Sequence, residues 1–435
     1  MALSERAART PDTLAQWVQD ARRRTLELIA DLDDNQLRGP ALPTINPLLW
    51  EIGHLAWFQE KWVLRHANQR HPLQPDADRL YDSAAVAHDT RWDLPLPARE
   101  QALGYMAQVE EQVLERLAQR PRPDEIYFTL LSIFHEDMHT EAFLYTRQTL
   151  GFPAPRLTGC AKVTPREGNG SWAGDVPVAG GTFLLGAEPG EPFVFDNEKW
   201  AHAVQLRAYA MARAPVTQGE FAAFVEDGGY NRQDLWCAEG WAWRERVGAT
   251  QPLYWRREEG SWLRRDFDQW LPLEAYRPVI HVNWYEADAY CRWAGRRLPT
   301  EAECEAAASL PAEGGRKRHL PWGKDEPTPD RANLDARALG CVEVAAHAAG
   351  DSACGCRQMI GNVWEWTADD FLPYPGFEPD PYKEYSALWF GDHKVLRGGC
   401  WATRSRLLRN TWRNFYRPER RDIFAGFRTC ALSSG

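Results

Sequence analysis

Residues 135–141 read His-Glu-Asp-Met-His-Thr-Glu, and they lie inside a long amphipathic stretch of the sequence. In an α-helix, residues four positions apart project from the same face, one turn above the other. His135 and His139 would therefore present two imidazoles to one point, a spacing that binds metal ions in many metalloenzymes. The same spacing also arises by chance in a chain with 11 histidines, so the surrounding sequence has to separate a metal site from ordinary core residues.

A third imidazole is available upstream. Residues 50–57 read Trp-Glu-Ile-Gly-His-Leu-Ala-Trp and place His54 on another expected helix. Three neutral imidazoles fill half of an octahedral coordination sphere and leave the other half to substrate and oxygen. The sequence therefore predicts a metal-dependent enzyme with His54, His135 and His139 as ligands.

The first 150 or so residues predict an all-helical domain. Their helix signals are capping residues, prolines at first helical positions and apolar residues at helical spacing. These signals predict helices over about 10–32, 46–65, 99–119 and 124–150, the last ending at Gly151. A Pro-, Asp- and His-containing loop over about 67–97 separates the second helix from the third. Four helices with one long crossover indicate a four-helix bundle, in which metal sites are built between facing helices.

The remainder of the chain has a different character. Short apolar runs bounded by glycine, at 181–186 and 395–399, indicate strands, and 284–295 predicts one clear helix. Most of the 21 tryptophans follow residue 170, which is typical of a loop-rich domain held by large aromatic anchors. We therefore predict an α+β protein, with a bundle over 1–155, a linker over 156–176 and a second domain over 177–435.

Composition excludes several classes of function. The net charge is −10 and no basic stripe accumulates, so nucleic acid is not an expected partner. No run of 18 apolar residues predicts a membrane span. The first residues form no apolar leader, and the nine cysteines form no disulfide pattern, which together predict a cytoplasmic protein with reduced thiols. Cys341, Cys354 and Cys356 cluster without completing a zinc spacing, and we expect them to be structural.

The second half resembles the formylglycine-generating enzymes, whose fold is the C-type-lectin-like sulfatase-modifying-factor domain. Five motifs carry the resemblance in order: 215–221, 281–287 leading into 292–303, 361–367, 397–399 and 425–428. Those enzymes use a cysteine pair after the Arg-Gly-Gly strand. Here that stretch holds Cys400 with no partner nearby, which disfavours sulfatase maturation.

A three-histidine bundle joined to this domain resembles the ergothioneine-biosynthetic sulfoxide synthases over essentially the whole chain. The resemblance implies a DinB-like bundle in which His54, His135 and His139 bind non-haem Fe(II). It also implies hercynine as substrate, with O2 driving bond formation between a chalcogen donor and the imidazole C2 carbon. Because the trimethylammonium group of hercynine offers no hydrogen-bond donor, we expect an aromatic pocket to receive it.

Two differences between this sequence and the sulfoxide synthases affect which chalcogen donor we expect. Many sulfoxide synthases have glutamine before the second histidine of the pair, and Met138 stands there in this chain. Some members bind a doubly carboxylated thiol peptide with closely spaced arginines, whereas the bundle loop here carries Arg91 with no neighbouring arginine. A neutral donor becomes more attractive, and the sequence around 135–151 is similar to the selenoneine synthases, which join a selenosugar to hercynine. Sulfoxide synthesis with a thiol donor is the alternative.

The resemblance also implies further site residues. Tyr374 and Tyr416 are candidates for a catalytic tyrosine that donates a proton or an electron, with Tyr385 as a rival. Asn414, Phe415 and Tyr416 are candidates for substrate binding in a C-terminal loop, and Met138 is a candidate for the pocket wall. Independently of the resemblance, Glu136 and Glu141 are candidates for accepting hydrogen bonds from the ligand N–H groups, although we expect at least one of them to be exposed to solvent instead.

Two further classes of function stay open on the sequence. DinB-like bundles also serve in thiol-dependent transfer, which suggests a metal-bound thiol transferase. Lectin-like domains often only bind ligands, which suggests a protein without catalytic activity. Oxygen consumption in the presence of hercynine and a chalcogen donor would distinguish the iron-dependent enzyme from the thiol transferase and from the binding protein.

Overall fold

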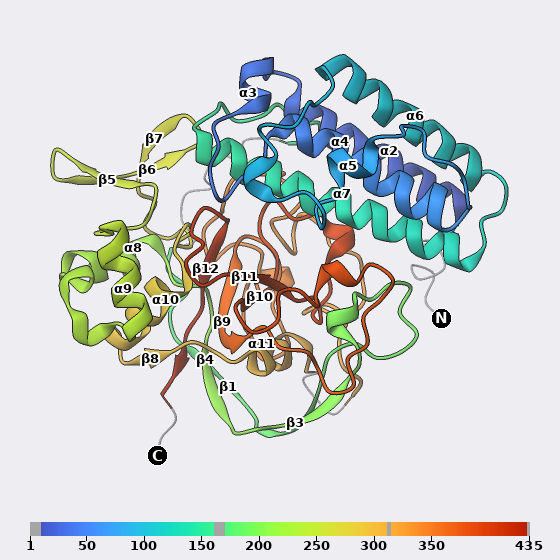
Figure 1. Ribbon diagram of the computed structural model, residues 1–435. Coiled ribbons are helices and arrows are strands. Elements are labelled where there is room, and N and C mark those ends of the chain that lie inside the picture. The colour runs from blue at the N-terminus through green and yellow to red at the C-terminus, as the bar shows by residue number, and fades with distance from the viewer. Residues whose placement is uncertain (1–9, 161–169, 311–314, 433–435) are drawn as a thin grey trace. The chain divides into compact units, whose positions relative to one another are not determined.

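The computed structural model describes residues 10–160, 170–310 and 315–432, and it confirms the predicted α+β class (Figure 1). The chain divides into two compact units. One comprises Met1–Gly159 with Glu191–Phe193, and the other comprises Cys160–Gly190 with Val194–Gly435. The N-terminal residues 1–9, and part of the predicted linker 156–176, lie outside the described residues.

The N-terminal unit is a bundle of four long helices. They are α2 Pro11–Ile29, α4 Leu48–Gln59 with its π-helical continuation η1 Glu60–His66, α6 Arg99–Leu117 and α7 Pro123–Leu150. The unit also includes the short helices α3 Asp34–Arg38, α5 Ala77–Tyr81 and η2 His88–Thr90. Helices α2 and α4 each contact both α6 and α7. This arrangement confirms the predicted four-helix bundle.

Local sequence explains where the first and last of these helices begin and end. Thr10 caps α2, because its hydroxyl accepts a hydrogen bond from the Thr13 amide at 3.2 Å while Pro11 occupies the first turn. Helix α7 also begins with a proline, Pro123, and it ends at Gly151 in the left-handed conformation (φ 65°). Glycine adopts that conformation without the steric cost that a Cβ atom brings.

In the described part of the C-terminal unit, the strands form four small sheets. Their strand orders are β1-β4-β13-β8, β11-β10-β9-β12, β2-β3 and β5-β6-β7. The strands are β1 Asp175–Val178, β2 Gly181–Leu185, β3 His202–Leu206, β4 Tyr209–Ala212, β5 Trp255–Glu258, β6 Ser261–Asp266, β7 Gln269–Pro272, β8 Arg296–Arg297, β9 Trp364–Asp370, β10 Lys394–Arg397, β11 Asn414–Tyr416, β12 Ala425–Phe427 and β13 Cys430–Ala431. The strands predicted at 181–186 and 395–399 are β2 and β10.

The helices described alongside these sheets are α8 Gln218–Glu226, α9 Ala238–Val247, α10 Trp284–Trp293 and α11 Glu301–Ser309. The helix predicted over 284–295 is α10. Single turns of 3₁₀ helix are η3 Asp196–Glu198, η4 Gly229–Asn231, η5 Gln233–Leu235, η6 Ala348–Gly350, η7 Lys383–Tyr385 and η8 Ser405–Leu407. Trp364, Trp366 and Trp401 are among the largest fully buried side chains, which agrees with the expectation of aromatic anchors.

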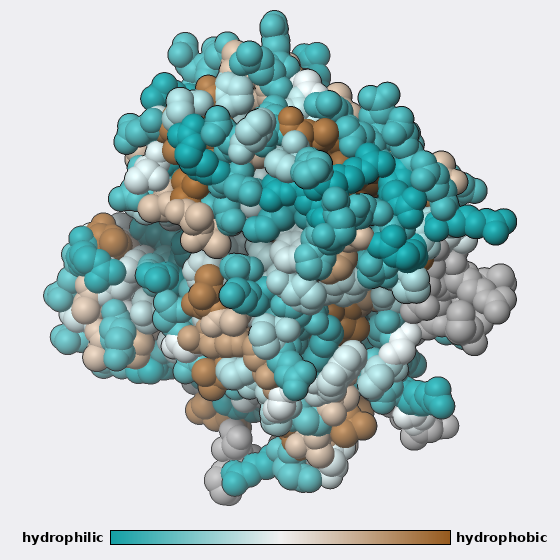
Figure 2. All heavy atoms as spheres, turned by 45° about the vertical axis from the view of Figure 1, so that its right-hand side comes forward, coloured by the Kyte–Doolittle hydropathy of each residue, from teal (hydrophilic) through white to brown (hydrophobic). Residues whose placement is uncertain are grey.

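The surface shown in Figure 2 is mainly hydrophilic, with hydrophobic residues scattered among polar ones. Isolated apolar residues of this kind are normal on folded proteins. Within the described ranges, every helix is too short or too polar to cross a membrane.

Candidate metal centre

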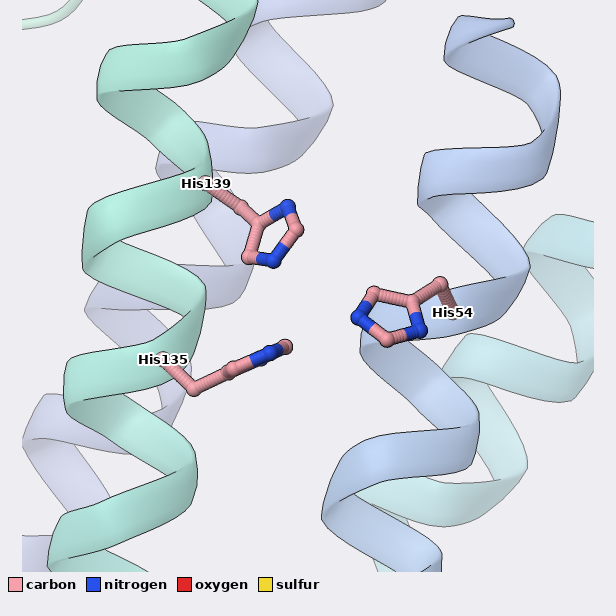
Figure 3. A group of neighbouring side chains, drawn as sticks. All are labelled: His54, His135 and His139. Atoms are coloured by element: carbon pink, nitrogen blue, oxygen red, sulfur yellow. The ribbon is translucent and has the colours of Figure 1, made fainter. Parts of the chain in front are cut away.

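Three imidazoles converge inside the bundle. His54 projects from α4, while His135 and His139 project from α7 one turn apart, and the three rings point toward one another (Figure 3). One nitrogen from each ring lies within 4.8 Å of the others. His54 and His135 are buried, and the side chain of His139 keeps 20% of its surface exposed. The predicted grouping of these histidines is therefore present in the structure.

His54 is held by backbone and by an aromatic neighbour. Its Nδ1 lies 2.8 Å from the carbonyl oxygen of Tyr81, so Nδ1 carries the proton and Nε2 keeps the lone pair. The ring of Trp50 stacks on the imidazole at 4.7 Å between centroids. Gly53 permits this arrangement, because a Cβ atom at this position would lie 2.2 Å from the Tyr81 ring.

His139 is held by a carboxylate. Its Nδ1 lies 2.5 Å from Oε2 of Glu51, one turn before His54 on α4. The other oxygen of Glu51 accepts a hydrogen bond from the Asn46 amide at 2.5 Å, and Asn46 in turn accepts one from Arg91 at 2.6 Å. A carboxylate in this position fixes the ring orientation and raises the basicity of the opposite nitrogen, as in carboxylate–histidine–metal arrangements.

His135 is positioned by packing. The ring of Phe58 lies parallel to the imidazole, with an interplanar angle of 2° and 3.6 Å between centroids. Phe58 follows His54 by one helical turn, so the same face of α4 supplies both a ligand candidate and the wall that orients another. The centroids of His135 and His139 are 4.4 Å apart.

Burial favours the neutral form of His54 and His135. Burial first, and then the neighbouring His139, together lower the pKa of His54 to about 3. Burial also lowers the pKa of His135 well below its ordinary range. Burial alone would raise the pKa of Glu51, but His139 and its hydrogen bond bring it down to about 2. Deprotonated imidazoles are the form that binds metals.

The donor set fits a divalent transition metal. Imidazole suits iron, zinc, copper and nickel, and two of the three rings have their second nitrogen fixed by an acceptor, which is the usual outer arrangement of a metal-bound histidine. Metal–nitrogen bonds of about 2.1 Å span at most about 4.2 Å between two ligand nitrogens. The nitrogens lie within 4.8 Å of one another, so the three rings are close enough together to be candidates for binding a single ion.

The expectation that Glu136 assists the ligands is wrong. Glu136 lies on α7 next to His135 but accepts hydrogen bonds from Arg22 at 3.0 Å and Thr25 at 2.8 Å, both on α2. Successive helical residues point in directions about 100° apart, so a neighbour of His135 faces another helix. Glu51 serves instead. Its position three residues before His54 was visible in the sequence, and that spacing signals a shared helix face.

Arg91 is held in place by contacts with other residues of the bundle. It is 8% exposed, donates hydrogen bonds to Asn46 and to the Val86 carbonyl oxygen at 3.2 Å, and lies 4.0 Å over the Trp50 ring. Burial lowers its pKa. Met138 precedes His139 on α7 and is half-buried.

The predicted substrate residues of the C-terminal unit lie on β11. This strand is at the edge of its sheet and pairs with β10 so that Asn414, Phe415 and Tyr416 oppose Leu396, Val395 and Lys394. All three are half-buried. Since alternate residues of a strand face opposite sides, Asn414 and Tyr416 share one face. Phe415 occupies the other, where it stacks on Phe371 with 4.0 Å between centroids.

Tyr374 lies in a different environment. It is 6% exposed and packs in a cluster with Phe183, Leu185 and Ala306. Its hydroxyl donates to Glu301 at 3.3 Å, and burial raises its pKa well above the usual range. The Arg413 guanidinium lies 4.1 Å over the Tyr374 ring.

Arg413 is a position that the sequence did not reveal. This buried side chain forms two bonds to Glu301, at 2.7 and 3.0 Å, and donates to the carbonyl oxygens of Asn197 at 2.9 Å and Leu372 at 3.1 Å. It thereby ties the start of β11 to α11 and to the segment before Tyr374. Its partners are distant in sequence, so no local signal marked it.

Comparison with known proteins agrees with the two-part architecture. A family model described as the sulfatase-modifying factor enzyme 1-like domain matches residues 161–432, and a DinB superfamily model matches residues 18–142. The formylglycine-generating enzyme of Streptomyces coelicolor is 32% identical over 280 residues, which cover 57% of this chain and 85% of that protein.

Longer matches cover both units. The hercynine oxygenase of Mycobacterium tuberculosis is 41% identical over 424 residues, covering 96% of this chain and 98% of the relative. The hercynine oxygenase of Mycolicibacterium thermoresistibile is 40% identical over 424 residues, covering 95% and 94%. Both matches cover nearly the whole of this chain and therefore extend over both units. The chain therefore belongs to the hercynine oxygenase family of oxidoreductases.

Proposed function

We propose that this protein is a non-haem Fe(II)- and O2-dependent enzyme that joins a chalcogen donor to the imidazole C2 carbon of hercynine. The observation that carries the proposal is the convergence of His54, His135 and His139 within 4.8 Å in a chain that is 41% identical to a hercynine oxygenase. The centre accounts for the metal, and the name of the relatives supports hercynine as the substrate.

The residues of the chain prepare the centre before any ligand arrives. The Tyr81 carbonyl oxygen holds the proton on Nδ1 of His54, and Glu51 holds it on Nδ1 of His139. Both Nε2 lone pairs are then available without a change of tautomer. When bound, iron supplies a Lewis acid, a binding point for the chalcogen donor and the redox chemistry of O2. The aromatic rings of Trp50 and Phe58 limit the access of water to the imidazoles.

We propose a selenosugar as the donor, which makes the product a carbon–selenium compound of the selenoneine type. Support comes from the bundle loop, where Arg91 is buried and hydrogen-bonded to Asn46 and Val86. An arginine engaged in this way is a poor receptor for the carboxylates of a thiol peptide. A neutral sugar carries no carboxylate and therefore needs no arginine to bind it.

Sulfoxide synthesis with a thiol donor is the second candidate. The resemblance of the whole chain to the ergothioneine-biosynthetic sulfoxide synthases favours it. The two reactions share the metal, O2 and hercynine, and they differ in the donor molecule and in the product that forms from it.

For the C-terminal unit we propose that Asn414, Phe415 and Tyr416 bind substrate. For the bundle, we propose separately that Met138, which precedes His139 on α7, forms a wall of a substrate pocket. Tyr416 is our first candidate for the catalytic proton or electron donor, because it is half-buried on an edge strand and shares a face with Asn414. Tyr374 remains the second candidate, although its hydroxyl is engaged by Glu301.

The test supplies full-length, Fe(II)-loaded protein with hercynine and O2, and adds either a selenosugar or a thiol donor. Oxygen consumption is followed, and products are identified by mass spectrometry. A product with the selenium isotope pattern, formed from the selenosugar mixture alone, supports the proposal. Turnover with the thiol donor alone selects the second candidate. Hercynine binding without oxygen consumption under either condition would reject both and leave a ligand-binding protein.

A histidine variant ties the activity to the centre. His135→Ala should lose both bound iron and turnover, because it removes a ligand without disturbing the hydrogen bonds of His54 and His139. His71→Ala is the matched control, since His71 is exposed in the bundle loop. Full turnover by His135→Ala would remove the metal assignment.

A further inference from the structure

Residues 352–356 form a closed turn that brings two cysteine thiols together. The Ser352 amide donates to the Cys356 carbonyl oxygen at 2.9 Å, and the Gly355 amide donates to the Ser352 carbonyl oxygen at 2.9 Å. The Ser352 hydroxyl also accepts a bond from the Cys356 amide at 3.2 Å. Gly355 has φ 92°, which favours glycine. The turn is therefore fixed by its own hydrogen bonds.

The sulfur atoms of Cys354 and Cys356 lie 3.8 Å apart, in hydrogen-bond contact. A disulfide needs a separation of about 2 Å, so the two sulfur atoms would have to move closer together before the bond forms. Cys354 is half-buried, while Cys356 is fully buried in a core cluster with Val176 and Met211. Cys354 is therefore the more exposed residue of the two, although its sulfur also contacts the Ser352 hydroxyl and the Ala307 carbonyl oxygen.

The more exposed residue, Cys354, also has the more acidic thiol. Its hydrogen-bond contacts, first with Cys356 and then with Ser352, lower the pKa of Cys354 to about 6 despite partial burial. The pKa of Cys356 is raised well above the usual range, first by its bond to Cys354 and then by burial. A partly exposed thiol with a lowered pKa beside a buried thiol with a raised pKa is the arrangement of a redox-sensitive cysteine with its resolving partner.

We propose that Cys354 and Cys356 form an oxidisable dithiol, a modification site at which a hydroperoxide converts the two thiols into an intramolecular disulfide. The site belongs to the C-terminal unit alone and does not depend on the metal centre or on the proposed function. It also revises the expectation that these cysteines have only a structural role.

The chemistry balances with the hydroperoxide as oxidant. The Cys354 thiolate attacks the terminal oxygen, the O–O bond breaks, and the alkoxide leaves and takes up a proton, which gives a sulfenic acid and an alcohol. The Cys356 sulfur then attacks the Cys354 sulfur, the S–O bond breaks, and water leaves. In sum, two thiols and one hydroperoxide yield one disulfide, one alcohol and one water.

The contrast with Cys237 supplies a control. Cys237 is also half-buried, but burial raises its pKa, and its sulfur accepts the Gly240 amide at the start of α9. A serine there can still cap the helix. Cys237→Ser should therefore leave the fold and the oxidation of the 352–356 turn unchanged.

The experiment treats reduced full-length protein with a stoichiometric alkyl hydroperoxide, alkylates the remaining thiols and maps the peptides after trypsin cleavage. Cleavage after Arg337 and Arg357 releases a single peptide that carries Cys341, Cys354 and Cys356. In the wild type, this peptide should become two hydrogen atoms lighter than its reduced form while Cys341 remains alkylated. In Cys356→Ser, Cys354 should stop at a sulfenic acid that dimedone traps.

In Cys354→Ser, neither the disulfide nor the sulfenic acid should form within the same time. A second probe needs no oxidant: a trivalent arsenical that bridges two thiols should bind the wild type about a hundredfold more tightly than either single variant, because the second bond is intramolecular. The proposal is overturned if the hydroperoxide oxidises other cysteines while this pair stays reduced. It is overturned equally if the arsenical fails to distinguish the wild type from the variants.

Discussion

Nδ1 of His139 and Oε2 of Glu51 lie 2.5 Å apart, which joins a ligand candidate on α7 to a carboxylate on α4. Glu51 stands one turn before His54, so the same helix contributes one ligand and orients another. The carboxylate is held in turn by Asn46. The geometry of the centre therefore depends on residues that would not touch the metal.

Glu51→Gln is expected to weaken metal binding by about 10- to 100-fold, the usual cost of losing such a partner. The amide keeps the size of the side chain but loses the charge that raises the basicity of the imidazole. Affinity can be measured by competition between the protein and a chelator for Fe(II) under anaerobic conditions.

Glu60→Gln is the matched control for this substitution. Glu60 is also buried in the bundle, where it accepts hydrogen bonds from the Tyr105 hydroxyl and from the Leu73 amide. Its replacement should leave metal affinity unchanged. If both variants bind metal like the wild type, Glu51 has no orienting role.

Gly53→Ala is expected to damage the centre without touching a ligand. The added Cβ would lie 2.2 Å from the Tyr81 ring, so Tyr81 has to move. Its carbonyl oxygen, which holds His54, would move with it. Overpacking of this kind costs about 1–3 kcal/mol of unfolding free energy, and we expect metal affinity to fall as well.

The same substitution at Gly104 serves as the control. Gly104 lies exposed in α6, and an added Cβ meets nothing within 4 Å. Alanine there should stabilise the protein by about 0.5–1 kcal/mol, because glycine is unfavourable inside a helix. Chemical denaturation of both variants gives the two free energies, and a stable Gly53→Ala variant with normal metal affinity would contradict the prediction.

The four bundle helices and the histidine centre could be predicted because their signals are local. The His135 and His139 pair is one turn apart, and Thr10, Pro123 and Gly151 mark helix ends by their own chemistry. The second predicted helix, 46–65, appears as α4 followed by the π-helical η1. Hydrophobic spacing does not distinguish these two forms over one or two turns.

The parts that escaped prediction depend on contacts between distant residues. Glu136 and Glu51 are both near ligands in sequence, and only the packing of α2 against α7 decides that Glu136 pairs with Arg22. The buried Arg413 and Glu301 are 112 residues apart. Helices α9 and α11 also went unpredicted, since both are short and the surrounding segments are rich in loops.

His281 is expected to make stability depend on pH. It is 4% exposed, and burial lowers its pKa from 6.5 to about 3. The folded state therefore binds fewer protons than the unfolded state between these values, and stability falls as the pH drops from 6.5 toward 3. At pH 5 this loss amounts to about 2 kcal/mol, since each pH unit below 6.5 contributes about 1.36 kcal/mol.

His281→Asn removes this contribution, and asparagine tolerates the positive φ of 62° at this position. The stability difference between wild type and variant should therefore shift by about 2 kcal/mol in favour of the variant between pH 7 and pH 5. Denaturant unfolding at both pH values measures this difference, in which the other titrating groups cancel. His71→Asn, in an exposed loop, should show the same difference at both values.

The two tyrosine candidates are distinguished by removing one hydroxyl at a time. If Tyr416 donates a proton or an electron to the reaction, Tyr416→Phe should lower kcat by about 10²- to 10⁴-fold and leave hercynine binding nearly unchanged. Tyr374→Phe removes a hydrogen bond of 3.3 Å to Glu301, but the same Glu301 oxygen still receives Arg413 at 2.7 Å. Its effect should be about 1 kcal/mol of stability or less, with kcat within a few-fold of the wild type. The opposite result, in which turnover survives Tyr416→Phe and fails in Tyr374→Phe, would transfer the catalytic role to the buried tyrosine.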